Sequence, residues 1–129
     1  ALAALGLEDL RTRTPGELSQ GERKLVGVAR ALTAEPQMVC MDEPAAGLDT
    51  TESLALGTRL RAVVDHGVTV LLVDHDMSLV LTVCDYLYVI EFGRLIAQGT
   101  PAEIRMNKLV IAAYLGEQAA PDLPPGESL

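Results

Sequence analysis

An apolar run that ends in two adjacent carboxylates and a proline constrains this chain more than any other feature. Residues 38–44 read MVCMDEP. A short apolar run is typical of a strand inside a sheet, and Pro44 cannot continue a strand's hydrogen-bond ladder. We therefore expect Asp42 and Glu43 to lie at the end of a strand. In open α/β sheets, ligands bind at that edge.

Helices are predicted on both sides of this strand. Two capping-box patterns, in which a short polar side chain is followed three residues later by glutamate, begin at Ser19 and Asp49. They predict helices over about residues 20–33 and 50–66. The first helix places its apolar residues on one side, as a helix packed on a core does.

A second apolar run, residues 68–73, follows the second helix and is rich in β-branched residues. It predicts a strand buried on both faces. Two strand–helix units in succession favour parallel strands joined by a crossover helix, and therefore an α/β domain. His75 follows the second strand as Glu43 follows the first, so we expect the two side chains at the same edge of the sheet.

The C-terminal part predicts smaller elements. Residues 86–90 and 95–98 flank a glycine-bearing turn and read as a β-hairpin. Thr100, with Pro101 after it and a glutamate three residues on, opens one or two short helices. From residue 117 the composition turns to proline, glycine and acid, which predicts a disordered tail over residues 117–129.

Composition excludes some functions and leaves others open. The formal net charge is −8, with eighteen acidic and ten scattered basic residues, so we expect no nucleic-acid partner. Only four residues are aromatic, and the core is therefore expected to be aliphatic. Cys40 and Cys84 belong to no metal-binding pattern, and we expect buried, reduced thiols in a reducing compartment. No apolar run approaches the ~18 residues of a membrane span.

The residues at the two strand ends suit metal-assisted phosphoryl chemistry. Asp42 would hold Mg²⁺, a cation that prefers hard oxygen ligands, and Glu43 would orient or deprotonate a water. His75 would donate a hydrogen bond to a phosphate oxygen. The helix that begins after Ser19 presents unpaired N–H groups that attract anions. Taken singly, each of these features is more simply a helix cap or a surface residue.

Four motifs in order resemble those of the ATP-binding-cassette ATPases. Residues 18–22 (LSQGE) resemble the signature motif, residues 41–44 (MDEP) the Walker B motif with its catalytic glutamate, and residues 46–49 (AGLD) the D-loop. His75 falls at the switch histidine. The resemblance runs over about residues 1–116 and implies part of a P-loop NTPase-type, RecA-like parallel sheet flanked by helices, with a C-terminal β-hairpin and short helices.

The resemblance also implies a role for each residue and a set of partners. The implied roles are these: Ser19, Gln20, Gly21 and Glu22 bind the ATP held by the opposite protomer, Asp42 serves Mg²⁺, Glu43 is the general base, Asp49 works across the dimer interface, and His75 senses the γ-phosphate. The implied partners are a second nucleotide-binding subunit and transmembrane permease subunits. The implied location is the cytoplasmic face of the cell membrane.

Within that family the chain looks most like the ATP-binding subunits of branched-chain amino-acid importers, and the lipopolysaccharide-exporter ATPase is similar over the same region. Gln20 and Glu22 depart from the commonest signature, LSGGQ, and Asp74 replaces the more usual hydroxyl or glutamate before the histidine.

No GxxxxGK[ST] loop occurs in the 129 residues, and that loop cradles the β- and γ-phosphates in the family. We therefore expect the C-terminal portion of a nucleotide-binding domain with no ATPase activity of its own. The alternative is a non-catalytic fragment that pairs with a complete ATPase subunit.

Overall fold

The structure, a computed structural model, describes residues 1–115, with the side chain of residue 115 left out. The described chain divides into two compact units, one of residues 1–84 and one that begins at residue 85. The predicted tail, residues 117–129, lies outside the described residues.

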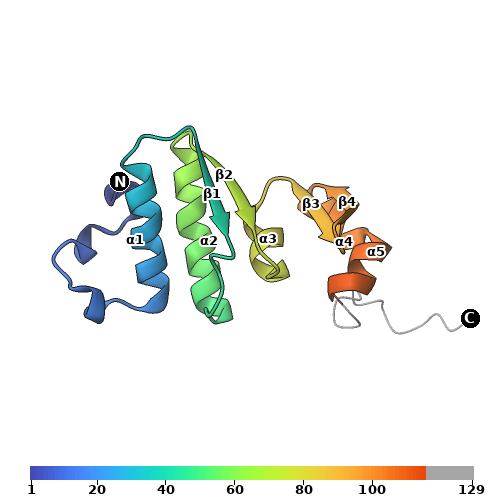
Figure 1. Cartoon of the computed structure of the whole chain (residues 1–129), viewed down its shortest axis with the longest axis horizontal. Helices are drawn as coiled ribbons and strands as arrows, with labels where there is room; N and C mark the ends of the chain where they lie inside the picture. Colours follow the sequence, from blue (N-terminus) through green and yellow to red (C-terminus); the bar gives the residue numbers. More distant parts are fainter. Residues whose placement is uncertain (116–129) are drawn as a thin grey trace, which may run out of the picture. The chain divides into compact units, whose positions relative to one another are not determined.

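The first unit is an α/β layer (Figure 1). Its elements are 3₁₀ turns Ala3–Leu5, Glu8–Leu10 and Pro15–Glu17, helix α1 (Gln20–Leu32), strand β1 (Met38–Asp42), helix α2 (Thr50–Asp65), strand β2 (Thr69–Val73) and helix α3 (Met77–Val83). Strands β1 and β2 pair in parallel, from Met38 opposite Thr69 to Asp42 opposite Val73. The predicted parallel pairing across a helical crossover is confirmed.

The helices of the first unit begin where their capping residues predict. Ser19 caps α1 and Asp49 caps α2, and in each box the glutamate three residues on accepts a hydrogen bond from the backbone N–H of the capping residue. Such caps satisfy N–H groups that the first turn of a helix leaves without partners. Helix α2 ends before Gly67, whose φ of +89° suits a glycine after a helix end.

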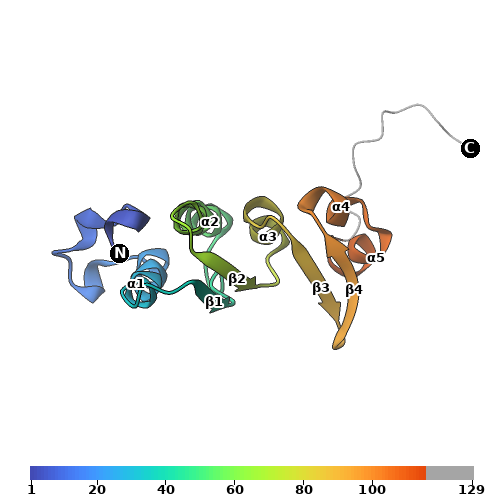
Figure 2. The ribbon, with the colours of Figure 1, turned by 90° about the horizontal axis from the view of Figure 1, so that it is seen from above.

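One face of the β1–β2 sheet packs against helices. Seen from above, α2 lies on one side of both strands (Figure 2). The core on that side is aliphatic, as predicted, and consists of Leu5, Leu7, Leu25, Val28, Ala29, Val39, Met41, Leu56, Leu60 and Val63. Burying a side chain of this size contributes roughly 1.5–3 kcal/mol, so this cluster is the main source of the unit's stability.

No element within residues 1–84 covers the other face of the sheet, and two predictions are corrected there. The expected burial of β2 on both faces is wrong, because Leu71 and Val73 are exposed. The expected burial of Cys40 is also wrong, since it lies on the open side of β1, while Cys84 is half-buried. The sequence provides apolar side chains for both faces, but the helices of this unit cover only one.

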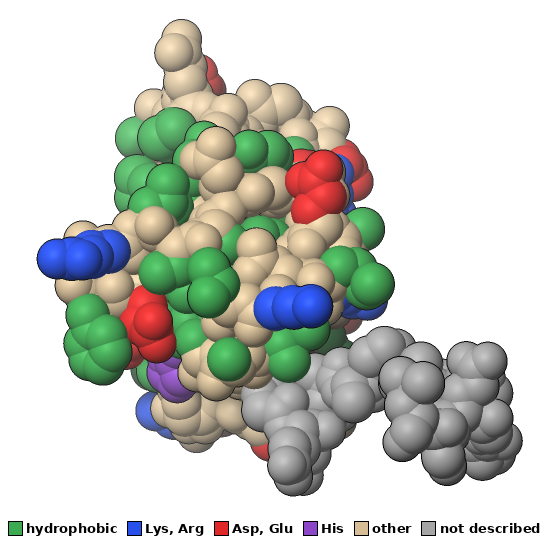
Figure 3. Space-filling model, turned by 90° about the vertical axis from the view of Figure 1, so that its right-hand side faces the viewer, with side chains coloured by type: hydrophobic (Ala, Val, Ile, Leu, Met, Phe, Trp, Pro, Cys, Tyr) green, Lys and Arg blue, Asp and Glu red, His purple; other side chains and the backbone are tan. Residues whose placement is uncertain are grey.

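The second unit is a β-hairpin with short helices. Strand β3 (Leu87–Glu91) pairs antiparallel with β4 (Arg94–Gly99), and helices α4 (Pro101–Met106) and α5 (Lys108–Val110) and a π-helical turn (Ile111–Leu115) follow. The predicted hairpin and the Thr100 cap are confirmed. The space-filling view shows hydrophobic side chains at the surface among acidic and basic ones (Figure 3).

Candidate functional site at the strand ends

The ends of β1 and β2 lie side by side. The segment with Asp42 and Glu43 and the segment with His75 are therefore close together. Asp42, the last residue of β1, pairs with Val73, the last residue of β2. The ladder continues for one more bond, because the Glu43 N–H donates to the Val73 carbonyl at 2.7 Å. Glu43 itself has a φ of +48°, a conformation that few non-glycine residues adopt. The chain therefore turns sharply at Glu43.

The turn brings Glu43 and His75 together, as the sequence predicts. Oε1 of Glu43 lies 3.6 Å from Nδ1 of His75, and both side chains are more than half exposed. The separation is longer than a good hydrogen bond. Because both side chains are also exposed, the pair is a solvent-accessible contact and not a buried ion pair. A carboxylate and an imidazole at one exposed edge are suited to proton transfer and to contact with a polar ligand.

Asp74, between β2 and His75, is a residue whose role the sequence analysis missed. Its side chain is 1% exposed, and its carboxylate accepts hydrogen bonds from the backbone N–H groups of Ala45 at 3.1 Å and Asp76 at 2.9 Å. Nδ1 of His75 lies 3.9 Å from Oδ1 of Asp74. The bond from Asp76 is local, but the bond from Ala45 comes from a segment 29 residues away, and no pattern of neighbouring residues shows it.

At the N-terminus of α1, the side chains of Ser19 and Glu22 each accept a hydrogen bond from the backbone N–H of the other residue. The Ser19 hydroxyl accepts from the Glu22 N–H at 3.1 Å, and the Glu22 carboxylate accepts from the Ser19 N–H at 2.7 Å. Arg13 also lies 3.9 Å from Glu22. The backbone N–H groups of the first turn are the anion-binding element at this end of the helix.

Gln20 packs against the turn that follows β1, and Gly21 lies near the same turn. Gly47 has a φ of +78°, and a Cβ built there would lie 2.6 Å from Nε2 of Gln20. A Cβ on Gly21 would lie 3.9 Å from Leu48. The Gln20 side chain therefore packs against Gly47, so the structure brings the signature-like and D-loop-like segments together. Asp49, at the end of the same turn, is held in the cap of α2.

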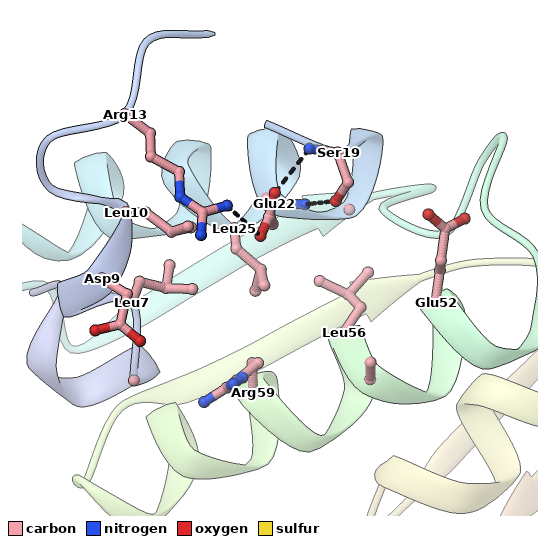
Figure 4. A pocket seen from close by; sticks show the side chains of 13 residues that line it. Leu7, Asp9, Leu10, Arg13, Ser19, Glu22, Leu25, Glu52, Leu56 and Arg59 are labelled. Carbon is pink, nitrogen blue, oxygen red and sulfur yellow. Dashed lines mark hydrogen bonds and ion pairs between the residues drawn. The ribbon is translucent and has the colours of Figure 1, made fainter. Parts of the chain in front are cut away.

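A cleft of about 290 Å³ lies between the N-terminal 3₁₀ segment, α1 and α2 (Figure 4). Leucine side chains form its apolar part, and charged side chains that include Arg13, Glu22, Glu52 and Arg59 surround them. Neither Glu43 nor His75 lines it. The cleft is therefore separate from the strand-end pair.

The acidic residues at the strand ends suit a metal that is shared with a substrate rather than held by protein alone. Within residues 1–115, no group of three or more His, Cys, Asp or Glu side chains is arranged to hold a metal ion. Asp42 offers one exposed carboxylate at the end of β1. Mg²⁺ is typically bound by one or two carboxylates together with waters and substrate phosphates, so Asp42 fits such a site.

The described helices give no sign of a membrane span. The part of the chain from Ala1 to Leu115 contains no helix that is both long and apolar enough to cross a bilayer.

Comparison with known proteins identifies the class that this fold and site define. Residues 1–46 match the family described as ABC transporter, and residues 94–120 match the family described as branched-chain amino acid ATP-binding cassette transporter. The ADP conformation of MJ1267, an ATP-binding cassette of an ABC transporter, superposes with a TM-score of 0.78 at 35% identity, over 90% of this chain and 47% of that one. The chain belongs to the ATP-binding cassettes of ABC transporters.

Among curated relatives, the similarity extends to particular transport proteins. The chain is 42% identical over 119 residues to the high-affinity branched-chain amino acid transport ATP-binding protein BraF of Pseudomonas aeruginosa, and this covers 90% of the chain and 46% of BraF. It is 40% identical over 111 residues to the lipopolysaccharide export system ATP-binding protein LptB of Escherichia coli. This match covers 86% of the chain and 46% of LptB. The chain thus spans about half the length of the curated relatives it matches.

Proposed function

We propose that this chain supplies the signature, Walker B, D-loop and switch-histidine half of an ATP-hydrolysing subunit of an ABC importer for branched-chain or related amino acids. The observation that carries the proposal is the 3.6 Å approach of Glu43 to His75 at the paired ends of β1 and β2. The match of residues 94–120 to the branched-chain amino acid family supports import over export.

In this proposal the strand-end residues act on the terminal phosphate of ATP. Glu43 accepts a proton from a water whose oxygen attacks the γ-phosphorus, and the bond from that phosphorus to the β–γ bridging oxygen breaks. ADP and phosphate are the products. His75 contacts a γ-phosphate oxygen, and Asp42 holds Mg²⁺. When bound, Mg²⁺ neutralises part of the phosphate charge.

The remaining predicted residues act across a dimer. Ser19, Gln20, Gly21 and Glu22 form the end of α1 that meets an ATP bound by a second nucleotide-binding subunit, and Asp49 contacts that subunit. Because Gln20 packs against Gly47, its side chain is directed toward the turn after β1. The departure from the commonest signature is therefore compatible with a phosphate approaching the helix end.

The phosphate cradle must come from outside these 129 residues, because they contain no GxxxxGK[ST] loop. A second polypeptide segment that carries the loop would complete the site. The completed subunit would bind permease subunits at the inner face of the cell membrane, and through them couple ATP hydrolysis to transport.

ATP hydrolysis by the chain, alone and mixed with the half of BraF that the chain does not match, tests this proposal. In the proposal that half carries the P-loop, and it is called the P-loop half of BraF. We expect background activity alone and turnover on mixing. Glu43→Gln is expected to lower that turnover by about 10²–10⁴-fold, the usual contribution of a general base. Glu35→Gln is the matched control, because Glu35 is also exposed and also has a positive φ, +49° against +48° for Glu43.

Two results would contradict the proposal. Turnover by the chain alone that disappears in Glu43→Gln would mean that no further segment is needed. Turnover of the mixture that is equal in the Glu43→Gln and Glu35→Gln variants would remove Glu43 from the chemistry.

A second candidate function is a non-catalytic fragment that lends its signature motif to a complete ATPase subunit. The observation that favours it is the Ser19-capped end of α1, whose first-turn N–H groups suit a phosphate. Equilibrium binding to full-length BraF with and without ATP separates the two. This second function would be favoured if the chain binds full-length BraF only with ATP, and if mixing the chain with the P-loop half of BraF gives no ATP hydrolysis.

A further inference from the structure

We propose that Asp74 is a positioning residue that sets the spacing of Glu43 and His75 by tying the turn after β1 to the turn after β2. The geometric part of this inference stands on the chain alone. Its catalytic consequence rests on the proposed function.

The carboxylate of Asp74 is buried, and each of its oxygens accepts a backbone hydrogen bond. The side chain is 1% exposed, and a buried carboxylate is costly unless hydrogen bonds compensate for the lost water. Here each oxygen accepts one backbone N–H: Oδ2 from Ala45 at 3.1 Å and Oδ1 from Asp76 at 2.9 Å. Hydrogen bonds to an ionised group are stronger than neutral ones, so both segments are held firmly.

The two donors belong to the two segments that carry the candidate catalytic pair. Ala45 lies two residues after Glu43, and Asp76 directly follows His75. Glu43 is thus bracketed by two bonds to the end of β2, its own N–H to Val73 and the Ala45 N–H to Asp74. An unusual backbone conformation, such as the φ of +48° at Glu43, persists when its surroundings hold it on both sides.

The far end of the tie is itself anchored. The Ser53 hydroxyl on α2 donates to Oδ2 of Asp76 at 2.7 Å, and Oδ1 of Asp76 accepts from the Leu79 N–H at 3.2 Å, which caps α3. Ser53 is buried, and the segment around His75 is therefore fixed to α2 as well as to β2. Asp74 couples Glu43 to this fixed segment rather than to a free loop.

The geometry requires two acceptors, which distinguishes aspartate from asparagine at this position. Both oxygens face N–H donors, so the amide of Asp74→Asn would turn its NH₂ group toward one of them and leave that donor without an acceptor. Asp74→Glu retains both acceptors and adds one methylene group. The pair of variants separates loss of an acceptor from a change in length.

The test on the chain itself measures backbone amide hydrogen exchange and the nuclear Overhauser contact between the Glu43 side chain and the His75 ring. In Asp74→Asn we expect the amide of Ala45 or Asp76 to exchange about tenfold faster, as loss of one hydrogen bond predicts, and the Glu43–His75 contact to weaken. Asp65→Asn is the matched control, an exposed aspartate at the end of α2, and is expected to change neither.

The catalytic test uses the mixture with the P-loop half of BraF. Asp74→Asn is expected to lower kcat by about tenfold while the KM for ATP changes by less than about twofold, and Asp74→Glu is expected to recover part of the loss. Unchanged exchange and an unchanged Glu43–His75 contact in Asp74→Asn would overturn the inference. So would altered exchange with an unaltered kcat, because the tie would then be structural only.

Two further outcomes remain decisive. If the mixture never hydrolyses ATP, the proposed function fails, while the exchange and contact measurements still decide whether Asp74 positions the pair. If Asp74→Asn does not fold, Asp74→Glu takes its place. Its longer side chain is expected to alter exchange at Ala45 and Asp76 together, and a change at neither would overturn the inference.

Discussion

The two faces of the β1–β2 sheet have similar apolar side chains and opposite surroundings. On the face that packs against helices, Val39 and Met41 are 7% and 9% exposed, whereas on the other face Met38 and Leu71 are 53% and 50% exposed. Parallel sheets normally have both faces covered. Both faces of these strands therefore carry apolar side chains of the kind that a covering layer buries. Residues 1–84 provide that layer on one face. In the proposed function, the rest of a nucleotide-binding domain would provide the second.

The largest expected effect compares two methionines on the same strand. Met41→Ala removes a buried side chain and is expected to lower the free energy of unfolding by about 2–5 kcal/mol. Met38→Ala, on the open face, is expected to change it by less than about 0.5 kcal/mol, as exposed substitutions usually do. Urea denaturation of both variants measures the difference. Equal losses would mean that the open face is covered in solution, for example by a second copy of the chain.

The next effect uses Cys40 as a probe of the open face. Cys40 is exposed and Cys84 is half-buried, so a thiol reagent is expected to modify Cys40 first in the native chain. Adding the P-loop half of BraF is expected to slow modification of Cys40 by about tenfold, because burial makes reaction depend on local opening. Mass spectrometry of digested samples gives both rates, with Cys84 as the internal reference. An unchanged Cys40 rate would show that the added half does not cover this face.

The smallest effect concerns an exposed carboxylate outside the sheet. The Thr14 N–H, and after it the Thr14 hydroxyl, hydrogen-bond Glu17 and lower the pKa of its carboxyl below the ordinary 4.5. A lowered folded-state pKa means that the stabilisation is present above pH 4.5 and is lost as the pH falls through the folded-state value. Glu17→Gln is therefore expected to lower the thermal midpoint slightly at pH 7.

Measuring the Glu17→Gln variant at several pH values separates the contribution of the Glu17 charge from other effects of acid. The difference between the parent chain and Glu17→Gln is expected to shrink as the pH falls below 4.5, because protonation of Glu17 removes the charge that the Thr14 hydrogen bonds stabilise. The exposed Glu8→Gln variant is the control for removal of one surface carboxylate in the same N-terminal segment. A loss of stability in Glu17→Gln larger than that in Met41→Ala would contradict the comparison of the two faces. That comparison assumes that buried side chains contribute more to stability than exposed ones.

The local features of the fold were predictable because neighbouring residues encode them. The caps at Ser19, Asp49 and Thr100 require only a side chain and a backbone group three residues apart, and the hairpin requires a turn that tolerates positive φ at Phe92 and Gly93. The proximity of Glu43 and His75 was also predictable, since parallel neighbouring strands end at the same edge.

The features that were missed depend on distant parts of the chain. The exposure of Cys40 depends on whether a second layer of the protein covers the sheet. The apolar pattern of a strand does not indicate whether one or both faces of its sheet are covered. The packing of Gln20 against Gly47 joins segments that are separated by a strand. The buried carboxylate of Asp74 accepts a hydrogen bond from the Ala45 N–H, 29 residues away.

The sequence by itself determined the order of the elements, where each helix begins, and which side chains follow each strand, because these are set by local hydrogen bonding and by the spacing of apolar residues. Only the tertiary structure decided that residues 1–84 cover one face of the sheet and not the other, and that a buried Asp74 links the segments of Glu43 and His75. Burial and long-range hydrogen bonds arise from how segments distant in the chain pack together, and no short stretch of residues contains that information.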